Sequence, residues 1–403
     1  MRKMKNFFED IEQDLVGSHL DSYWTGFVPV AYALFDKEFV YLFNHPKLIK
    51  SPNKNYQILE RDDQFMACTL ILYEDYPTAI VDLELYHNYA SLYSILVHEL
   101  FHGFQYIKGE KRFADETMGI TYPLSKENIQ LRSQERLYLY RAVLEKDRVK
   151  KRQYLATFIS LREKRGNLID EYLVYENLIE TIEGPAWYVE LRSFFEKSQQ
   201  SYRFILEKYG EQLIDNFDST LNIRKSCYSS GLFMCLLLDE FLPKWKDSFW
   251  DQEKTIYDLL KQIPLNEAIQ INETEKNPET GKVIDYVLEN RKRTIANLEK
   301  EKGINLFIKG KINLKSFDPM NIVLSGDKVL HRSFLKVEIN NQDYLIQQPV
   351  IAYCKGGFRN IIKLHLLLKE KPIENIDSLT VDCVGRIKGK YEKEGTSLYL
   401  NVN

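Results

Sequence analysis

The chain is poor in cysteine, and its few cysteines are far apart. Its 403 residues include five of them, an odd number, and no two form a C-x-x-C pair. They are Cys68, Cys227, Cys235, Cys354 and Cys383. This spacing argues against a disulfide framework and against a zinc site built from thiolates, and it favours a reducing compartment.

Long apolar runs and a strong net charge are also missing. The run 232–238 is typical of the longest apolar stretches and falls far short of the roughly 20 residues that a membrane span needs. Between residues 9 and 14, four carboxylates interrupt what would be the apolar core of a signal peptide. The net charge is -3 and there is no run of lysine and arginine, so nothing favours a nucleic-acid partner. We expect a soluble, cytoplasmic protein without a membrane span.

The length and the distribution of residue types predict more than one domain and an α+β fold. A chain of 403 residues exceeds what one small hydrophobic core serves. Short apolar runs between Pro, Asn and Asp clusters predict a β-rich part at 20–86, with strands over 27–35, 39–43, 65–73 and 78–85. Charge-rich faces and long stretches free of Gly and Pro predict helices through most of 125–302.

From about residue 303 the pattern changes. Segments of strand length alternate or run apolar between turn residues, at 305–314, 321–324, 329–339, 344–354, 358–368 and 378–386. This pattern predicts a separate all-β module at 303–403, a sandwich or a small barrel. The module carries no motif tied to chemistry, and we expect it to shape substrate access or to mediate association.

Histidine is scarce, yet two of the seven histidines stand four residues apart. The pentapeptide HELFH occupies 98–102, in an apolar segment whose spacing predicts a helix over 89–107 with Asn88 or Ser91 as its cap. Residues four apart share one helix face, so His98 and His102 can reach a single zinc ion. Glu99 lies beside that face, where it can take a proton from metal-bound water. This is the helix signature of zinc hydrolases; the alternative is a core helix whose histidines only satisfy hydrogen bonds.

A catalytic zinc takes three protein ligands and leaves one position for water, so a third ligand is needed. Downstream, the segment EGPAWYVE occupies 183–190. The HExxH helix followed by this segment is similar to the gluzincin clan of metallopeptidases, the thermolysin-like and aminopeptidase-like group. In the aminopeptidase branch the first glutamate of a Glu-Gly-x-Ala segment is the third ligand, which implies Glu183 here. The resemblance also implies a zincin-like catalytic domain over 1–302, divided into the β-rich part 20–86, the active-site helix 89–107 and the helical remainder 108–302.

The residues around Glu183 allow this assignment and leave alternatives. Gly184 and Ala186 are small, which would let their helix press against the metal helix. Glu180, one turn earlier, could ligate the metal instead, or it could accept a hydrogen bond from a histidine Nδ1–H without touching the metal. Glu176 and Glu190 are weaker candidates for that second role. The 80 residues of 103–182 separate the second histidine from Glu183, far more than in the aminopeptidases. The resemblance is therefore to the clan and its site, not to one family.

Two further elements resemble gluzincin features. Tyr228 opens a Tyr-x-x-Gly segment at 228–231, and in aminopeptidase-like gluzincins such a tyrosine steadies the oxyanion. With 26 tyrosines in the chain, the alternative is a tyrosine that packs at a helix start. The strand 78–85 or the strand 65–73 resembles the sheet edge that pairs with an extended peptide substrate.

The sequence therefore predicts a zinc-dependent peptidase. His98, His102 and Glu183 would bind Zn²⁺, Glu99 would act as general base, and Tyr228 would stabilise the tetrahedral intermediate. The Gly-x-Met-Glu-Asn stretch by which aminopeptidases hold a free amine is absent, which favours an endopeptidase acting on a peptide or protein. Two alternatives remain: a catalytically silent peptide-binding scaffold, and a zinc hydrolase with a non-peptide substrate. The sequence leaves the oligomeric state open.

Overall fold

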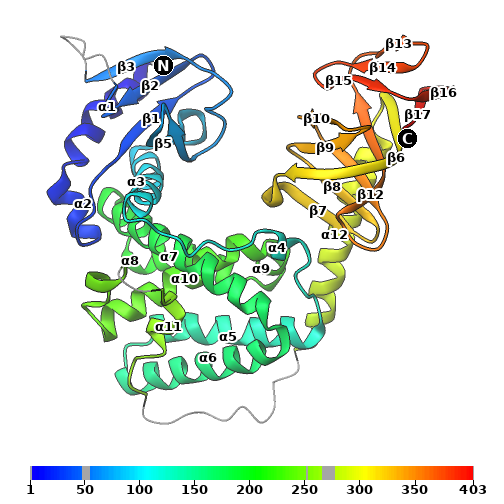
Figure 1. Ribbon diagram of the computed structural model, residues 1–403. Coiled ribbons are helices and arrows are strands. Elements are labelled where there is room, and N and C mark those ends of the chain that lie inside the picture. The colour runs from blue at the N-terminus through cyan, green and yellow to red at the C-terminus, as the bar shows by residue number, and fades with distance from the viewer. Residues whose placement is uncertain (1, 48–54, 251–252, 266–276, 403) are drawn as a thin grey trace. The chain divides into compact units, whose positions relative to one another are not determined.

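The computed structural model describes residues 2–47, 55–250, 253–265 and 277–402, and these form an α+β structure (Figure 1). The chain divides into two compact units: unit 1 contains 1–114 and 127–276, and unit 2 contains 115–126 and 277–403. The division differs from the boundary at 302/303 that we expected, because α12 (Thr280–Lys300) belongs to unit 2. Ile295 of α12 packs in a small apolar cluster with Leu330 and Ile351 of the β region, and this burial joins the helix to the strands.

The sheet of unit 1 has the strand order β3-β2-β1-β5-β4 in the part of the chain that the structure describes. Only the pair β1–β5 is parallel. Tyr32 and Leu34 of β1 face the main core, while Ala33 and Phe35 face a second apolar cluster, so the strand is buried on both faces. The bounds are β1 (Ala31–Phe35), β2 (Phe39–Phe43), β3 (Tyr56–Glu60), β4 (Thr69–Tyr73) and β5 (Tyr76–Asp82).

These strands differ from the expected ones in number and in extent. β3 was not expected, because its exposed and half-buried residues give no clear alternation. The expected strand over 78–85 stops at Asp82, whose side chain accepts from the backbone N–H of Glu84 and starts the 3-10 turn η1 (Leu83–Leu85). Two helices, α1 (Arg2–Asp14) and α2 (Gly17–Tyr23), precede the sheet.

The helix α3 (Tyr89–Ile107) follows the sheet and carries the HELFH motif over the range expected from the sequence. The Asn88 side chain caps it by accepting a 2.9 Å hydrogen bond from the backbone N–H of Ser91. Gly103 lies against Val30, and a Cβ atom at this position would overlap the valine side chain. The missing side chain therefore lets α3 lie close to the chain that enters β1.

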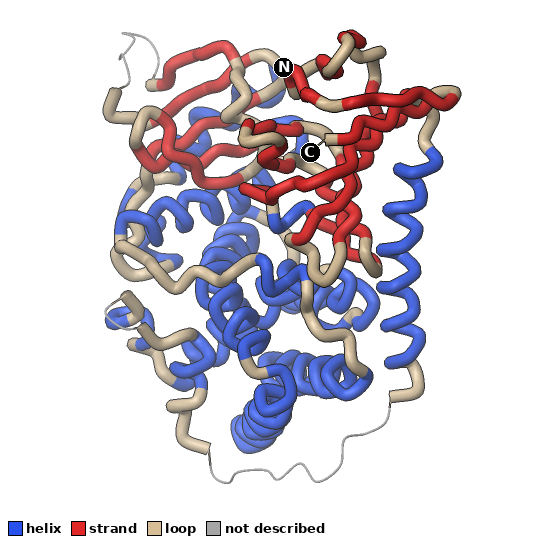
Figure 2. Tube along the Cα trace, turned by 45° about the vertical axis from the view of Figure 1, so that its right-hand side comes forward, coloured by secondary structure: helices blue, strands red, loops and turns tan. Residues whose placement is uncertain are grey.

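The remaining helices of unit 1 lie on the side of α3 away from the sheet (Figures 1 and 2). They are α5 (Lys126–Leu144), which begins at the unit boundary, α6 (Arg148–Ile169), α7 (Glu171–Lys197), α8 (Tyr202–Ile214), α9 (Asn216–Leu221), α10 (Ile223–Phe241), the 3-10 turn η2 (Trp245–Ser248) and α11 (Ile256–Leu260). α7 is packed between α3 and α10. The sheet, α3, α7 and α10 therefore form successive layers.

α7 and α10 cross in backbone contact at two glycines. A Cβ atom on Gly184 would lie 2.6 Å from the Gly231 Cα atom, and one on Gly231 would lie 2.6 Å from the carbonyl oxygen of Glu180. The expectation that Gly184 lets α7 press against the metal helix was therefore wrong. The glycine serves the contact with α10, and Gly231 of the Tyr-x-x-Gly segment is its counterpart.

Replacing Gly231 by alanine is expected to lower the free energy of unfolding by about 1–3 kcal/mol, because the added methyl group meets backbone atoms that cannot move aside. Urea unfolding monitored by circular dichroism measures the change. Gly281→Ala is the control, since its Cβ atom would have Lys126 Cε at 4.0 Å as its nearest contact and the helix gains about 1 kcal/mol at most. Equal stability of Gly231→Ala and wild type would contradict the close crossing.

Unit 2 is built on a branched sheet around the long strand β6 (Ile304–Phe317). In the described residues, β6 pairs along one side with β12, and along the other side with β17 near its start and with β9 near its end. The pair β6–β17 is parallel and the other ladders of the sheet are antiparallel. Gly310 sits at the fork with a φ of 142°, where a Cβ atom would collide with the Val402 carbonyl oxygen.

The bounds within this unit are α4 (Thr117–Ile120), η3 (Pro319–Asn321), β7 (Ile322–Ser325), β8 (Lys328–His331), β9 (Leu335–Ile339), β10 (Gln342–Ile346), β11 (Val350–Cys354), β12 (Asn360–Leu368), β13 (Ile373–Asn375), β14 (Ser378–Val381), β15 (Gly385–Lys388), β16 (Lys390–Glu394) and β17 (Ser397–Asn401). Three expected strands, 329–339, 344–354 and 378–386, are each split into two. Strands β13, β16 and β17 were not expected. Across the described parts of both units, no helix is sufficiently long and apolar to cross a membrane.

Candidate metal site

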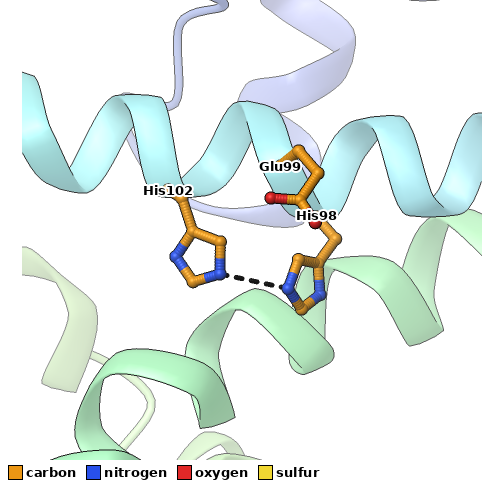
Figure 3. A group of neighbouring side chains, drawn as sticks. All are labelled: His98, Glu99 and His102. Carbon is orange, nitrogen blue, oxygen red and sulfur yellow. Dashed lines mark hydrogen bonds between the residues drawn. The ribbon is translucent and has the colours of Figure 1, made fainter. Parts of the chain in front are cut away.

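The structure brings the two histidines of α3 together with Glu183 of α7. The Nε2 atoms of His98 and His102 are 3.1 Å apart (Figure 3). The Glu183 Oε2 atom lies 3.4 Å from His102 Nε2 and 3.8 Å from His98 Nε2. Two ligands 2.0–2.1 Å from a tetrahedral zinc ion are about 3.3 Å apart, so this triangle of donor atoms has the size of one face of a zinc site.

The other ring nitrogen of each histidine has its own partner. His98 Nδ1 lies 2.9 Å from Glu190 Oε2, and His102 Nδ1 lies 2.7 Å from Gln105 Oε1. A carboxylate and an amide oxygen only accept hydrogen bonds, so both Nδ1 atoms carry a proton. In neutral imidazoles both Nε2 atoms would then present a lone pair, and the 3.1 Å hydrogen bond between them requires one added proton. The two Nε2 atoms and Glu183 Oε2 therefore face one point, where their mutual repulsion is relieved by a cation or by an added proton.

The pKa shifts at the site also arise from the contacts between histidines and carboxylates. Burial alone would lower the pKa of His98, but the hydrogen bond to Glu190 and the neighbouring carboxylates raise it to about 9. Burial alone would raise the pKa of Glu183, but His102 and then Arg224 lower it to about 2. The residues thus hold a negative carboxylate and attract positive charge in a place from which water is largely excluded.

Glu183 is fixed from the side opposite the histidines. Arg224 of α10 donates from Nη2 to Glu183 Oε1 over 3.0 Å, and this leaves Oε2 to face the two imidazoles. The sequence interpretation missed Arg224. Its position one turn before Tyr228 was the available signal, because residues four apart on a helix lie on the same face.

Glu99 follows His98 and is buried at the same site. Its exposed fraction is 6 %, and its carboxylate lies next to the histidines in Figure 3. His98, Glu99 and His102 each offer one possible ligand atom, and these three atoms lie within 4.8 Å of one another. Burial raises the pKa of Glu99, and the two imidazoles counteract part of that rise. A carboxylate with a raised pKa accepts a proton more readily than an exposed one.

Glu190 lies on the far side of His98 from the donor triangle. Its Oε2 atom accepts from His98 Nδ1, and its Oε1 atom accepts a 2.8 Å hydrogen bond from the Tyr209 hydroxyl. The carboxylate is therefore held from both sides, and it fixes the ring orientation of His98 from outside the metal position.

Glu180 and Glu176 are placed elsewhere. The two Glu180 oxygens accept from the Arg162 guanidinium at 2.6 and 2.7 Å, and the Ser230 hydroxyl donates to Oε1. Glu176 pairs in the same way with Arg165, at 2.6 and 3.0 Å. Both carboxylates are fully buried and turned from the histidines, so the structure gives Glu180 neither of the roles that we considered for it.

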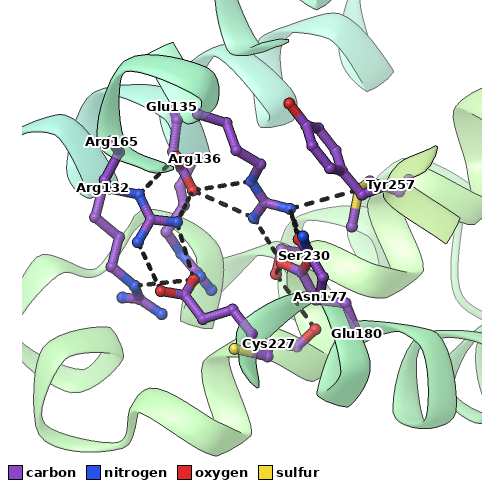
Figure 4. Close-up of polar contacts among 12 residues, drawn as sticks. Arg132, Glu135, Arg136, Arg165, Asn177, Glu180, Cys227, Ser230 and Tyr257 are labelled. Atoms are coloured by element: carbon purple, nitrogen blue, oxygen red, sulfur yellow. Dashed lines mark hydrogen bonds and ion pairs between the residues drawn. The ribbon is translucent and has the colours of Figure 1, made fainter. Parts of the chain in front are cut away.

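These two glutamates belong to a buried ion cluster that joins α5, α6 and α7 (Figure 4). We define this cluster as Arg132, Glu135, Arg162, Arg165, Glu176 and Glu180. Glu176, Glu180 and Cys227 also have donor atoms within 4.8 Å of one another. Guanidinium groups already neutralise these carboxylates, so a second cation there would meet like charge.

Tyr228 lies next to the Glu183 side of the site. Its ring meets Trp187 edge-on with centroids 5.7 Å apart, and the Arg224 guanidinium lies 5.2 Å above it. The ring is half-buried, and its hydroxyl has no protein hydrogen-bond partner among the described residues. The Tyr228 ring therefore packs against its neighbours, as the alternative interpretation held, and its hydroxyl group can donate a hydrogen bond to another molecule.

Of the two strands considered for substrate pairing, only one has a vacant side. β5 is hydrogen-bonded to β1 and to β4, so the strand expected over 78–85 cannot accept a peptide. β4 pairs with β5 alone in the described part of the chain and forms an edge. Cys68 precedes β4, and its Sγ atom lies 3.8 Å from the Tyr86 hydroxyl. Burial raises the pKa of this thiol, and the nearby negative charge of Glu99 adds to the rise. The start of β4 is therefore near the motif helix.

Comparisons with known proteins were made for the whole chain. No protein-family model matches it, and no curated protein and no solved structure matches it. The resemblance to gluzincins that we expected from the sequence therefore rests on the HELFH helix and the segment 183–190 alone.

Proposed function

We propose that this chain is a zinc-dependent peptidase with a gluzincin-type site. The observation that supports this most is the donor triangle of His98 Nε2, His102 Nε2 and Glu183 Oε2, with separations of 3.1, 3.4 and 3.8 Å. Two imidazoles and one carboxylate are a known ligand set for catalytic zinc, and they leave a fourth position for water. The residues present thus fit the ion in donor type and spacing.

His98, His102 and Glu183 would hold a zinc ion, which would supply a Lewis acid to lower the pKa of water and to polarise a carbonyl group. Glu99 takes the proton of the attacking water and then delivers it to the leaving amine. Its burial beside the histidines keeps bulk water from competing for that proton. His98 and His102 are held by Glu190 and Gln105, so neither ring has to reorient during the reaction.

Two groups are suited to the substrate. The Tyr228 hydroxyl donates to the oxygen of the carbonyl group as negative charge develops there. The vacant edge of β4 pairs with an extended peptide backbone, which favours internal peptide bonds over chain ends. The five cysteines are free thiols, which suits a reducing compartment such as the cytoplasm.

Zinc binding is the first test. At free zinc 100-fold above the Kd, wild type should gain about 2.7 kcal/mol in free energy of unfolding, and Glu183→Gln should lose most of that gain. Glu171→Gln is the matched control, because Glu171 is exposed on the same helix, and it should respond like wild type. Urea unfolding with and without zinc, together with metal analysis after dialysis, measures both effects.

The second test is cleavage of a broad peptide library by the zinc-loaded chain, read by mass spectrometry. Cleavage at internal bonds supports the proposal. Zinc binding without cleavage of any peptide would favour the silent scaffold, or a hydrolase of another substrate if ester or amide probes are turned over. A wild-type chain that binds no zinc would overturn the proposal.

A further inference from the structure

A glutamine outside the motif connects the two halves of the site. Gln105 lies on α3 one turn after His102 and is 3 % exposed. Its Nε2 atom donates a 2.7 Å hydrogen bond to the carbonyl oxygen of Ile182, the residue before Glu183. Its Oε1 atom lies 2.7 Å from His102 Nδ1. One amide group therefore touches the helix that carries both histidines and the helix that carries the third donor.

The carbonyl group that accepts from this amide lies in the helical turn before a proline of α7. Pro185 has no backbone N–H, so the carbonyl group of Thr181, four residues earlier, loses its helical partner, and the proline ring crowds this turn. The carbonyl group of Ile182 is the next one in the same turn, and it accepts from Gln105 of α3.

The bond to Ile182 decides which way the amide of Gln105 points. A carbonyl oxygen can only accept, so the NH₂ group must face Ile182 and Oε1 must face His102. Oε1 can also only accept, so His102 must be protonated at Nδ1. Its Nε2 atom is then left with a lone pair directed at the donor triangle.

We propose that Gln105 is a positioning residue that sets the tautomer and ring orientation of His102 for metal binding. The part that concerns zinc affinity rests on the proposed function. The tautomer of His102 is a property of the metal-free chain and does not depend on it.

The test uses full-length protein with ¹⁵N-labelled histidine. In zinc-free wild type, long-range ¹H–¹⁵N spectra should show His102 as the Nδ1–H tautomer, with assignment by loss of the signal in His102→Ala. Gln105→Met keeps the length of the side chain but removes both hydrogen bonds, and should give mixed tautomers. Gln105→Glu keeps an acceptor for His102 but loses the donor to Ile182, so it should keep the tautomer.

Zinc affinity from chelator competition is the second readout. Gln105→Met should weaken binding 10- to 100-fold, which is the usual effect of removing the partner of a ligating histidine. Gln153→Met, at an exposed glutamine of α6, is the control and should leave both readouts unchanged. Circular dichroism confirms that each variant is folded.

An Nε2–H tautomer in wild type would overturn the inference, whatever the variants do. So would a Gln105→Met chain that keeps the Nδ1–H tautomer and binds zinc as wild type does. If wild type binds no zinc but shows the Nδ1–H tautomer and Gln105→Met loses it, the proposed metal site fails while the role of Gln105 toward His102 stands.

Discussion

Replacing Glu99 by glutamine should lower kcat/KM for peptide cleavage by about 10²- to 10⁴-fold, while zinc stays bound. Glutamine has the same shape as glutamate but cannot take a proton from water. The change should be in kcat, because the donor triangle of His98, His102 and Glu183 does not include this carboxylate. Steady-state kinetics on a peptide found by library cleavage, with metal analysis of the same samples, measures the effect.

Stability gives an internal check on this variant. Glu99 is buried and its raised pKa reflects a cost of keeping it charged, so a neutral glutamine should leave the free energy of unfolding within about 1 kcal/mol. Glu84→Gln, at an exposed glutamate before the same helix, should retain wild-type activity. A Glu99→Gln enzyme with more than a tenth of wild-type activity would show that another group is the base.

The second large effect is on stability and comes from the buried ion cluster. Arg162→Met should lower the free energy of unfolding by about 3–5 kcal/mol, because it leaves the Glu180 and Glu135 carboxylates buried without this guanidinium. Both partners are fully buried, so water cannot replace the lost donors. Urea unfolding at neutral pH measures the change.

Arg203→Met is the matched control for Arg162→Met. Arg203 makes an exposed pair with Glu207 one turn along α8, and such pairs contribute about 0.3–0.5 kcal/mol. The double variant with Arg162→Met and Glu180→Gln should be less destabilised than the sum of the single variants, since each removes a charge that the other leaves unpaired. An Arg162→Met chain as stable as Arg203→Met would mean that the cluster does not hold these helices together.

The local parts of the site were readable from the sequence because they depend on nearby residues. The helix over 89–107 and its Asn88 cap follow from apolar spacing and from one side chain. The choice between Glu183 and Glu180 depends on groups far along the chain. Arg162 pairs with Glu180, and Arg224 orients Glu183; both arginines lie on other helices than the glutamates that they bind.

The differences in the fold have the same origin. β3 is an edge strand of half-buried and exposed residues, so its sequence carries little signal, and β5 ends early because Asp82 forms a local turn. The membership of α12 in unit 2 depends on apolar contacts with strands that follow it in the chain. Gly184 and Gly231 were both noticed as sequence features, but only their mutual contact explains why each is small.

The rotation of α7 about its own axis is fixed twice. Glu180 is anchored to Arg162, and Glu183, three residues later, points to the histidines. Deleting one residue between them would turn the following helix by about 100°, so that the two carboxylates could not both keep their partners. The ion cluster thus fixes which side of α7 faces the metal site. Insertions or deletions should be tolerated at the exposed ends of α7 but not in the turn between Glu180 and Glu183.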